Sequence, residues 1–167
     1  MSAKPVIYVA NVSEGGLEGN RYSKVVEDVA KQDGAPVIVL SSKIEEEIAK
    51  LNEDEKKEFM EMLGLKESGL DKLAKVGYRM LGLITFFTAG PKEVRGWTIK
   101  EGTTAKEAAG VIHSDIEKGF IRAEVIKYED YIKAGGEKEA KEKGLMRLEG
   151  KDYIMQDGDV VYFRFNV

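Results

Sequence analysis

The chain has 167 residues, of which 43% are hydrophobic and 34% charged, with a formal net charge of −4 and no cysteine. This composition is ordinary for a soluble globular protein, and it excludes disulfides, thiolate metal sites and a membrane span, which needs an apolar run of ~20 residues. Because there is no secretory leader at residues 1–5 and no overall basic footprint, we expect a cytoplasmic protein with no membrane or DNA partner, whose contact with RNA would need a local basic patch.

The first predicted elements are two strands with a helix between them. Residues 5–10 (P-V-I-Y-V-A) and 36–40 (P-V-I-V-L) are continuous apolar runs, typical of strands buried on both faces of a parallel sheet. Apolar residues recur at helical spacing over residues 22–29, and Asp33-Gly34 gives a helix stop. A single strand–helix–strand unit cannot cover its own sheet, so we expect it to belong to a larger doubly wound sheet with further strands upstream.

Helices are predicted over residues 42–82. Ser42 and Glu45 have the spacing of a capping box, in which the serine accepts from an early amide and the glutamate reaches back. New helix starts follow at Asn52 and Ser68. The acidic run at residues 53–55 is favourably placed near a helix N-terminus and is interpreted as a solvated face.

After Gly82 the pattern becomes rich in strands, and we place a domain boundary there, between residues 1–82 and 83–167. A turn signal at residues 89–92 separates the first two strands, and a helix begins after the cap at Thr104. The predicted strands cover residues 83–88, 94–99, 121–126, 146–149, 153–155 and 160–165, with charged helical segments at 128–143. Two strands, a helix and further strands predict a small α+β roll of the β-grasp kind.

The segment Asn11-Val12-Ser13-Glu14 follows the first strand directly, at the sheet edge where doubly wound folds bind ligands. P-loop GTPases carry N-K-x-D at this place, and the aspartate accepts hydrogen bonds from guanine. Here Val12 replaces the lysine, and Glu14, with its longer side chain, replaces the aspartate, so the discrimination in favour of guanine is lost. Backbone groups around Val12 and Ser13 could instead recognise adenine. The alternative is that this segment is only a strand-to-helix turn, with Asn11 or Ser13 as a cap.

A second segment, Ser41-Ser42-Lys43, follows the second strand and corresponds to the S-A-K half of the base pocket in P-loop GTPases. Capping alone would also explain Ser42. Taken together, two such segments on adjacent strands favour nucleotide recognition.

The sequence lacks the motifs that usually bind phosphate and its metal ion. The motif G-x-x-x-x-G-K-[ST] is absent, and so is a D-x-x-G following a strand, although phosphoryl transfer depends on holding phosphates and metal. No catalytic or metal-binding residue is predicted, and His113 is interpreted as structural. Trp97, Phe86 and Phe87 are expected in the core. Four basic residues could either form one local basic face or be scattered over the surface: Arg95, Lys118, Arg122 and Lys151.

Several long segments resemble the YchF family of Obg-like ATPases over essentially the whole chain. They are K-P-V-I-Y-V-A-N-V-S-E, S-S-K-I-E, L-I-T-F-F-T-A-G-P-K-E-V-R-G-W-T-I, A-A-G-V-I-H-S-D-I-E-K-G-F-I-R-A-E-V and Q-D-G-D-V-V-Y-F-R-F-N-V. The departures are mild: Ser42 and Gly96 stand where the family has alanine. Ser114 and Ile116 replace the threonine and the phenylalanine of the usual H-T-D-F. The larger departure is that the phosphate loop, switch regions and coiled-coil arm of the family would precede Lys4.

The resemblance implies an α/β fragment, the last βαβ unit and helices of a P-loop NTPase domain, followed by a ubiquitin-like β-grasp module, the TGS domain. It implies a ribosome-associated ATPase that prefers ATP over GTP and uses Mg in the full-length protein, with base contacts at Asn11, Val12, Ser13, Glu14, Ser41, Ser42 and Lys43. For this chain alone we expect weak or absent ATP binding, no hydrolysis, and binding to the large ribosomal subunit, RNA or a protein through the TGS domain. The alternatives are a free-standing TGS-type adaptor for RNA or the ribosome, and half of a complementing ATPase.

Overall fold

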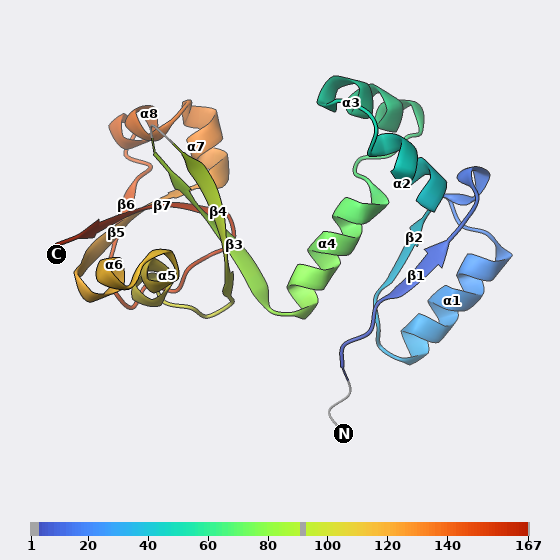
Figure 1. The fold of residues 1–167 in the computed structure, drawn as a ribbon, viewed down its shortest axis with the longest axis horizontal. Coiled ribbons are helices and arrows are strands. Elements are labelled where there is room, and N and C mark those ends of the chain that lie inside the picture. Colours follow the sequence, from blue (N-terminus) through green and yellow to red (C-terminus); the bar gives the residue numbers. More distant parts are fainter. Residues whose placement is uncertain (1–3, 91–92, 167) are drawn as a thin grey trace. The chain divides into compact units, whose positions relative to one another are not determined.

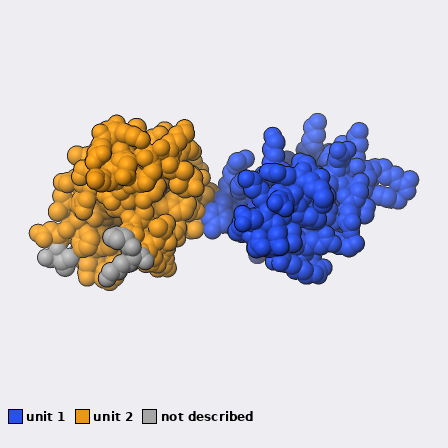
Figure 2. Space-filling model, turned by 90° about the horizontal axis from the view of Figure 1, so that it is seen from above, with its two compact units in different colours: residues 1–81 blue, residues 82–167 orange. Residues whose placement is uncertain are grey.

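The structure is a computed structural model that describes residues 4–90 and 93–166, and it divides into two compact units, residues 1–81 and 82–167 (Figure 2). The sequence pattern placed the boundary one residue further on, after residue 82. Each unit has its own sheet.

The first unit contains a two-stranded parallel sheet, β1 (Tyr8–Asn11) and β2 (Val37–Leu40), joined through helix α1 (Arg21–Gln32) (Figure 1). This confirms the predicted strand–helix–strand unit. Asn20 caps α1 by accepting hydrogen bonds from the amides of Tyr22 and Ser23. Most of the apolar residues at helical spacing in α1 are exposed, however, and Val26 is half-buried.

The buried positions of α1 are Ser23 and Ala30, whose small side chains let the helix approach the strands closely. The side chains of Tyr22 and Val25 are 65% and 60% exposed. Helical periodicity therefore located the helix correctly, but in the described part of the chain the helix carries a second apolar stripe that nothing covers.

Three helices complete the first unit: α2 (Ser42–Ile48), α3 (Glu53–Met62) and α4 (Gly69–Met80). The predicted starts at Asn52 and Ser68 are confirmed, because both side chains accept hydrogen bonds from amides of the following turn. The predicted capping box at Ser42 is wrong. The N-cap of α2 is Ser41, whose side chain makes no capping bond.

Glu45 has a different partner, which explains why the box does not form. Its buried carboxylate accepts hydrogen bonds from the amides of Gly69 (2.7 Å) and Leu70 (3.2 Å), at the start of α4. These amides have no partner inside their own helix, and a negative charge is favourable at a helix N-terminus. The carboxylate thereby fastens α4 to α2.

Replacing this carboxylate should destabilise the first unit. We expect Glu45→Ala to lower its free energy of unfolding by about 1.5–3 kcal/mol, because two amides lose a charged acceptor in a buried place. Amide hydrogen exchange over residues 42–80 measures the effect. The matched control is Glu46→Ala, which removes only an exposed ion pair with Lys50 and should have almost no effect. Equal effects of the two substitutions would contradict the role assigned to Glu45.

The second unit is built on a five-stranded mixed sheet in the order β4-β3-β7-β5-β6. The central strand β7 is parallel to β3 and antiparallel to β5. The strands are β3 (Leu83–Ala89), β4 (Val94–Lys100), β5 (Phe120–Lys127), β6 (Arg147–Glu149) and β7 (Asp159–Phe165). Helices α5 (Ala105–Ile112) and α6 (Ser114–Lys118) lie on one side of this sheet, and α7 (Tyr128–Ala134) and α8 (Glu137–Glu142) on the other (Figure 1).

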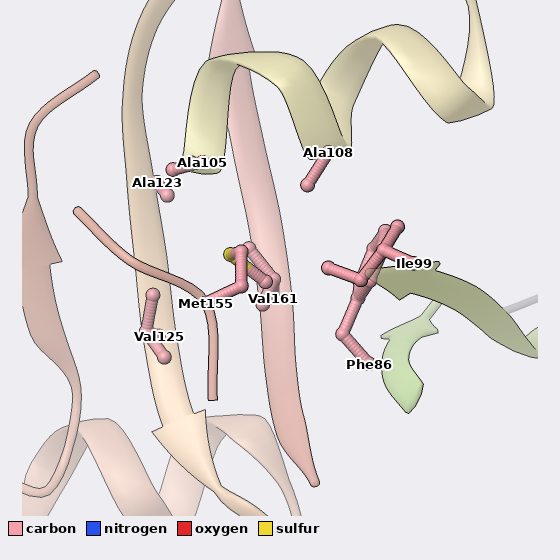
Figure 3. Close-up of a cluster of buried hydrophobic side chains, with 8 residues drawn as sticks. All are labelled: Phe86, Ile99, Ala105, Ala108, Ala123, Val125, Met155 and Val161. Atoms are coloured by element: carbon pink, nitrogen blue, oxygen red, sulfur yellow. The ribbon is translucent and has the colours of Figure 1, made fainter. Parts of the chain in front are cut away.

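The core of the second unit lies between the sheet and α5. Phe86 is the largest fully buried side chain, and Ala105 and Ala108 of α5 face it and its neighbours (Figure 3). The alanines allow the helix to lie close to the sheet, and a capping box between Thr104 and Glu107 fixes where it begins. The full cluster consists of Phe86, Ile99, Ala105, Ala108, Ala123, Val125, Met155 and Val161.

The sequence pattern misplaced two segments of this unit. The strand predicted over 153–155 is absent, and residue Ile154 makes only an isolated bridge with Thr104. Helix α6 was not predicted, because its five residues are too few to show a periodic pattern. Of the turn predicted at residues 89–92, Pro91 and Lys92 lie outside the described residues.

The face of the sheet that carries α7 and α8 holds a buried carboxylate. Glu124 accepts hydrogen bonds from Arg122 (3.0 Å) and from Arg164 (2.8 Å) on the neighbouring strand. The bond from Arg164 is the main reason why the pKa of Glu124 is lowered, against the opposing effect of burial. The ionised form is therefore stabilised by folding.

The Glu124 carboxylate should make the stability of the second unit depend on pH. Because its pKa is lower in the folded state, its contribution is fully present above the ordinary glutamate pKa and is lost as the pH falls through the folded value. We expect Glu124→Gln to be less stable than the parent at pH 7 and the difference to shrink below about pH 4. Urea titrations from pH 7 to pH 3, followed by the fluorescence of Trp97, measure this. A difference that grows toward low pH would contradict it.

Candidate functional site

A hollow of about 600 Å³ opens at the carboxyl ends of β1 and β2. We call it the strand-end hollow. Its lining residues come from the two segments that follow these strands, and they are Asn11, Val12, Ser13, Glu14, Gly15, Ser41, Ser42 and Lys43. All seven predicted site residues thus lie together. Gly15 was missed; it directly follows the predicted segment, and a Cβ added to it would meet no atom within 4 Å.

Parallel pairing explains why the two segments meet. The register places Asn11 opposite Leu40, so both strands end at the same level, and the amide of Val12 extends the pairing by donating to the carbonyl of Leu40 (2.8 Å). After this bond the chain turns into a short 3₁₀ helix, Glu14–Gly16. The carboxyl edge of a parallel sheet is where such folds bind ligands.

Asn11 joins the two segments. Its Oδ1 accepts hydrogen bonds from both the backbone amide and the hydroxyl of Ser42, each 3.0 Å long. The alternative in which Asn11 caps the following turn does not occur, because Oδ1 is engaged across the hollow. Within residues 4–90 and 93–166 the amide nitrogen of Asn11 makes no hydrogen bond, so the side chain can still donate to a ligand.

Glu14 and Lys43 form an ion pair across the hollow. The hydrogen bond to Glu14 raises the pKa of Lys43, so the lysine stays charged. Both side chains are more than half exposed, and such pairs contribute little to stability. Glu14 stands where P-loop GTPases carry the aspartate that binds guanine. Because Lys43 partly neutralises the Glu14 carboxylate, this carboxylate is a weaker acceptor for the donor groups of guanine.

The remaining groups suit a flat heterocyclic base. Val12 is half-buried and supplies apolar surface, and the backbone and hydroxyl groups around it supply donors and acceptors. A volume of this size is within the range of small-molecule sites. Lys43 is the one cationic residue among those that line the hollow, and it is already paired with Glu14. The lining residues are therefore better suited to bind a base than a phosphate.

The other residues considered from sequence lie in the second unit. His113 is structural, as predicted: its Nδ1 accepts from the amide of Asp115 at the start of α6. Trp97 packs against the core, and the guanidinium of Arg95 lies 4.2 Å from its ring centroid. Arg122 is hydrogen-bonded to Glu124, so this guanidinium is engaged away from Arg95, Lys118 and Lys151.

Neither a metal site nor a membrane span is found among the described residues. Within residues 4–90 and 93–166, no three acidic or histidine side chains are placed so as to hold a metal ion together. Over the same part of the chain, no helix has the length and apolar character needed to cross a membrane.

Comparison with known proteins gives matches to both units. The family model YchF-GTPase_C, described as a protein of unknown function (DUF933), matches residues 83–166. The ribosome-binding ATPase YchF of Haemophilus influenzae is 56% identical over 167 residues, which is 100% of this chain and 46% of that protein. The protein of the same name from Bacillus subtilis is 54% identical over 170 residues, with the same coverage.

A solved structure agrees with these matches. The Schizosaccharomyces pombe YchF GTPase superposes with a TM-score of 0.83 at 37% identity, covering 97% of this chain and 44% of that one. The chain therefore spans about half the length of the relatives it matches.

Proposed function

The chain belongs to the YchF family, and we propose that it corresponds to the C-terminal portion of a ribosome-binding ATPase of that family. In this proposal residues 1–82 supply the adenine-recognising part of the nucleotide site, and residues 83–167 supply a TGS binding module. The sequence contains no phosphate loop, so this chain binds its partners and does not hydrolyse ATP.

The observation that carries the proposal is the strand-end hollow. Two segments separated by about thirty residues line it together, with Asn11 bonded directly to Ser42. The position of Glu14 supports a preference for ATP over GTP, because its carboxylate is paired with Lys43 and guanine needs a free carboxylate at this place. Adenine needs only a donor and an acceptor, which the surrounding backbone can supply.

The topology of the second unit supports its assignment as a TGS domain. Its strand order, β4-β3-β7-β5-β6 with β3 and β7 parallel, is the order expected for a ubiquitin-like β-grasp fold. Relatives at 54–56% identity are named ribosome-binding, which supports the ribosome, through its large subunit or RNA, as the partner of this unit. A protein partner would likewise be bound by this unit.

Nucleoside titration tests the nucleotide part of the proposal. We expect adenosine to shift the amide resonances of Val12 and Ser42 at millimolar concentration, guanosine to do so more weakly, and ATP to bind no more tightly than adenosine. Phosphate contacts would otherwise add affinity, and this chain has no loop to make them. The control variant Val12→Glu should abolish the shifts by putting a charge on the apolar wall. Micromolar ATP binding, or measurable ATP turnover, would contradict the proposal.

Cosedimentation tests the ribosome part and separates the alternatives. We expect the chain to pellet with large ribosomal subunits and residues 1–81 alone not to do so. Pelleting that needs no nucleotide and no first unit favours a free-standing adaptor. Restoration of ATP turnover by adding the N-terminal half of a relative favours a complementing ATPase.

A further inference from the structure

Strand β4 forms one edge of the five-stranded sheet, and its outer side has no neighbouring strand among the described residues. It is seven residues long and pairs with β3 in an unbroken register, whereas β6 at the opposite edge has three residues. Proteins usually protect a long, regular edge with a bulge, a proline or a shorter strand, because its unpaired backbone groups can bind another chain. β4 has none of these three protections, and its charged residues are Arg95 and, at the last position, Lys100.

The hydrogen bonds at the two ends of β4 show which of its backbone groups face outward. At each end a backbone hydrogen bond of 2.8 Å joins an odd-numbered residue, Glu93 or Glu101, to the facing segment. In an antiparallel pair every second residue bonds in this way, so the odd-numbered residues of β4 direct their backbone groups toward β3. The backbone groups of Val94 and Gly96 therefore face away from the sheet. No hydrogen bond among the described residues engages them, so an added strand can pair with them.

The side chain of Arg95 is held at this edge without an opposite charge. Its guanidinium lies 4.2 Å from the ring centroid of Trp97 and forms no ion pair within residues 4–90 and 93–166. Trp97 is itself fixed, because it packs against the core and its indole N–H donates to Oγ1 of Thr88 (2.9 Å). The other arginines of the second unit all pair with carboxylates of the protein. Arg95 therefore keeps its N–H donors for the carboxylate of a partner.

We propose that β4 binds an extended acidic segment of another protein, which adds to the sheet as a further strand beside β4. Backbone hydrogen bonds to Val94 and Gly96 hold the segment, and a carboxylate opposite Arg95 selects it. This interface is a protein-binding site, and it is separate from the nucleotide and RNA contacts proposed above.

The pairing of the added strand defines the chemistry of the bound segment. Since the outward-facing residues make the hydrogen-bonded pairs, Arg95 and Ile99 fall in non-hydrogen-bonded pairs, where side chains of adjacent strands lie closest. A hollow of about 450 Å³ adjoins Ile99 and is also lined by Val111 of α5, whose side chain is 48% exposed. In an antiparallel strand the segment therefore carries an aliphatic residue opposite Ile99 and, four residues later, an aspartate or glutamate opposite Arg95.

A synthetic peptide tests this interface on the full chain. The probe is acetyl-T-V-T-V-T-E-T-amide, in which the first valine and the glutamate have the required spacing, and a matched peptide has lysine in place of the glutamate. We expect the glutamate peptide to change the fluorescence of Trp97, the single tryptophan, and to slow hydrogen exchange at the amides of Val94 and Gly96. The lysine peptide should bind roughly threefold to tenfold more weakly, and Arg95→Glu should reverse this preference. Failure of the glutamate peptide to bind at millimolar concentration, or equal binding of the two peptides, overturns the inference.

Two substitutions at Gly96 test the backbone pairing. Gly96→Pro removes an outward-facing N–H, which an edge strand tolerates, and should lower the affinity for the glutamate peptide at least about tenfold. Gly96→Ala keeps the N–H, and its Cβ comes no closer than 3.4 Å to another atom, so its affinity should stay within about twofold of the parent.

Equal peptide affinity of the two Gly96 variants would show that the edge of β4 does not bind a strand. Single-stranded RNA that changes the fluorescence of Trp97 equally in the parent and in Gly96→Pro would show that Arg95 contacts a nucleic acid, and this also overturns the inference. If Gly96→Pro does not fold, the reversal of peptide preference in Arg95→Glu decides the question.

Discussion

Phe86→Ala is expected to lower the free energy of unfolding of the second unit by about 3–5 kcal/mol. Phe86 is completely buried, lies on β3 opposite Trp97 of β4, and packs edge-to-face against Phe163, with ring centroids 6.0 Å apart. The neighbours of the lost ring include alanines, which cannot extend to fill the cavity. Because domains of this size are stable by only about 5–15 kcal/mol, this loss is a large share of the stability of the second unit, and the unfolding midpoint should fall well below that of the parent.

Trp97 is the single tryptophan of the chain, so its fluorescence follows the unfolding of the second unit without a signal from the first. The matched control is Val94→Ala on the adjacent strand, whose side chain is 72% exposed and whose loss should change stability by less than about 0.5 kcal/mol. Similar unfolding midpoints for the two variants would show that Phe86 does not hold the core together.

Gly119→Ala is the second substitution with a large expected effect, about 2–3 kcal/mol. A Cβ on Gly119 would lie 2.0 Å from the carbonyl oxygen of Asn166 and 2.9 Å from its carbon. The backbone of Gly119 has φ −87° and ψ 8°, which any residue can adopt, so the obstacle is space alone. The obstructing atoms are backbone atoms, and they can withdraw only if the end of β7 moves away from β5.

Such a movement would break the hydrogen bond from the Asn166 amide to the Gly119 carbonyl, which is 2.9 Å long. We therefore expect faster hydrogen exchange at Asn166 and an earlier unfolding transition of Trp97 fluorescence. Gly150→Ala is the control, because a Cβ at Gly150 meets no atom within 4 Å. Unchanged exchange at Asn166 in the Gly119 variant would contradict the close contact.

The sequence predicted most of the helices and strands because their signals are local. Apolar runs located β1 and β2, and the polar caps at Asn52, Ser68 and Thr104 located three helix starts. The failure at Glu45 has a different origin. Its partners, Gly69 and Leu70, lie more than twenty residues along the chain, so the choice between a local and a distant amide depends on tertiary packing.

The residues of the candidate site, like most helices and strands, could be predicted from the sequence. The spacing of its two segments sufficed to bring all the predicted residues into one hollow, because parallel strands end at the same sheet edge. The hydrogen-bond partner of each side chain could not be predicted from the sequence. Asn11 could have been a cap or a ligand contact, and only the structure shows that its oxygen bonds to Ser42 while the Ser41 hydroxyl has no partner among the described residues.

The place of β7 in its sheet has a consequence for synthesis of the chain. This strand is formed by residues 159–165 and yet lies in the middle of the sheet, between β3 and β5. On the ribosome the earlier strands emerge first, and nothing can join the β3–β4 hairpin to β5 until β7 follows. At translation speeds of about 5–20 residues per second, the nascent chain presents two unpaired strand edges for several seconds. The five-stranded sheet of the second unit can therefore be completed only after its central strand leaves the exit tunnel.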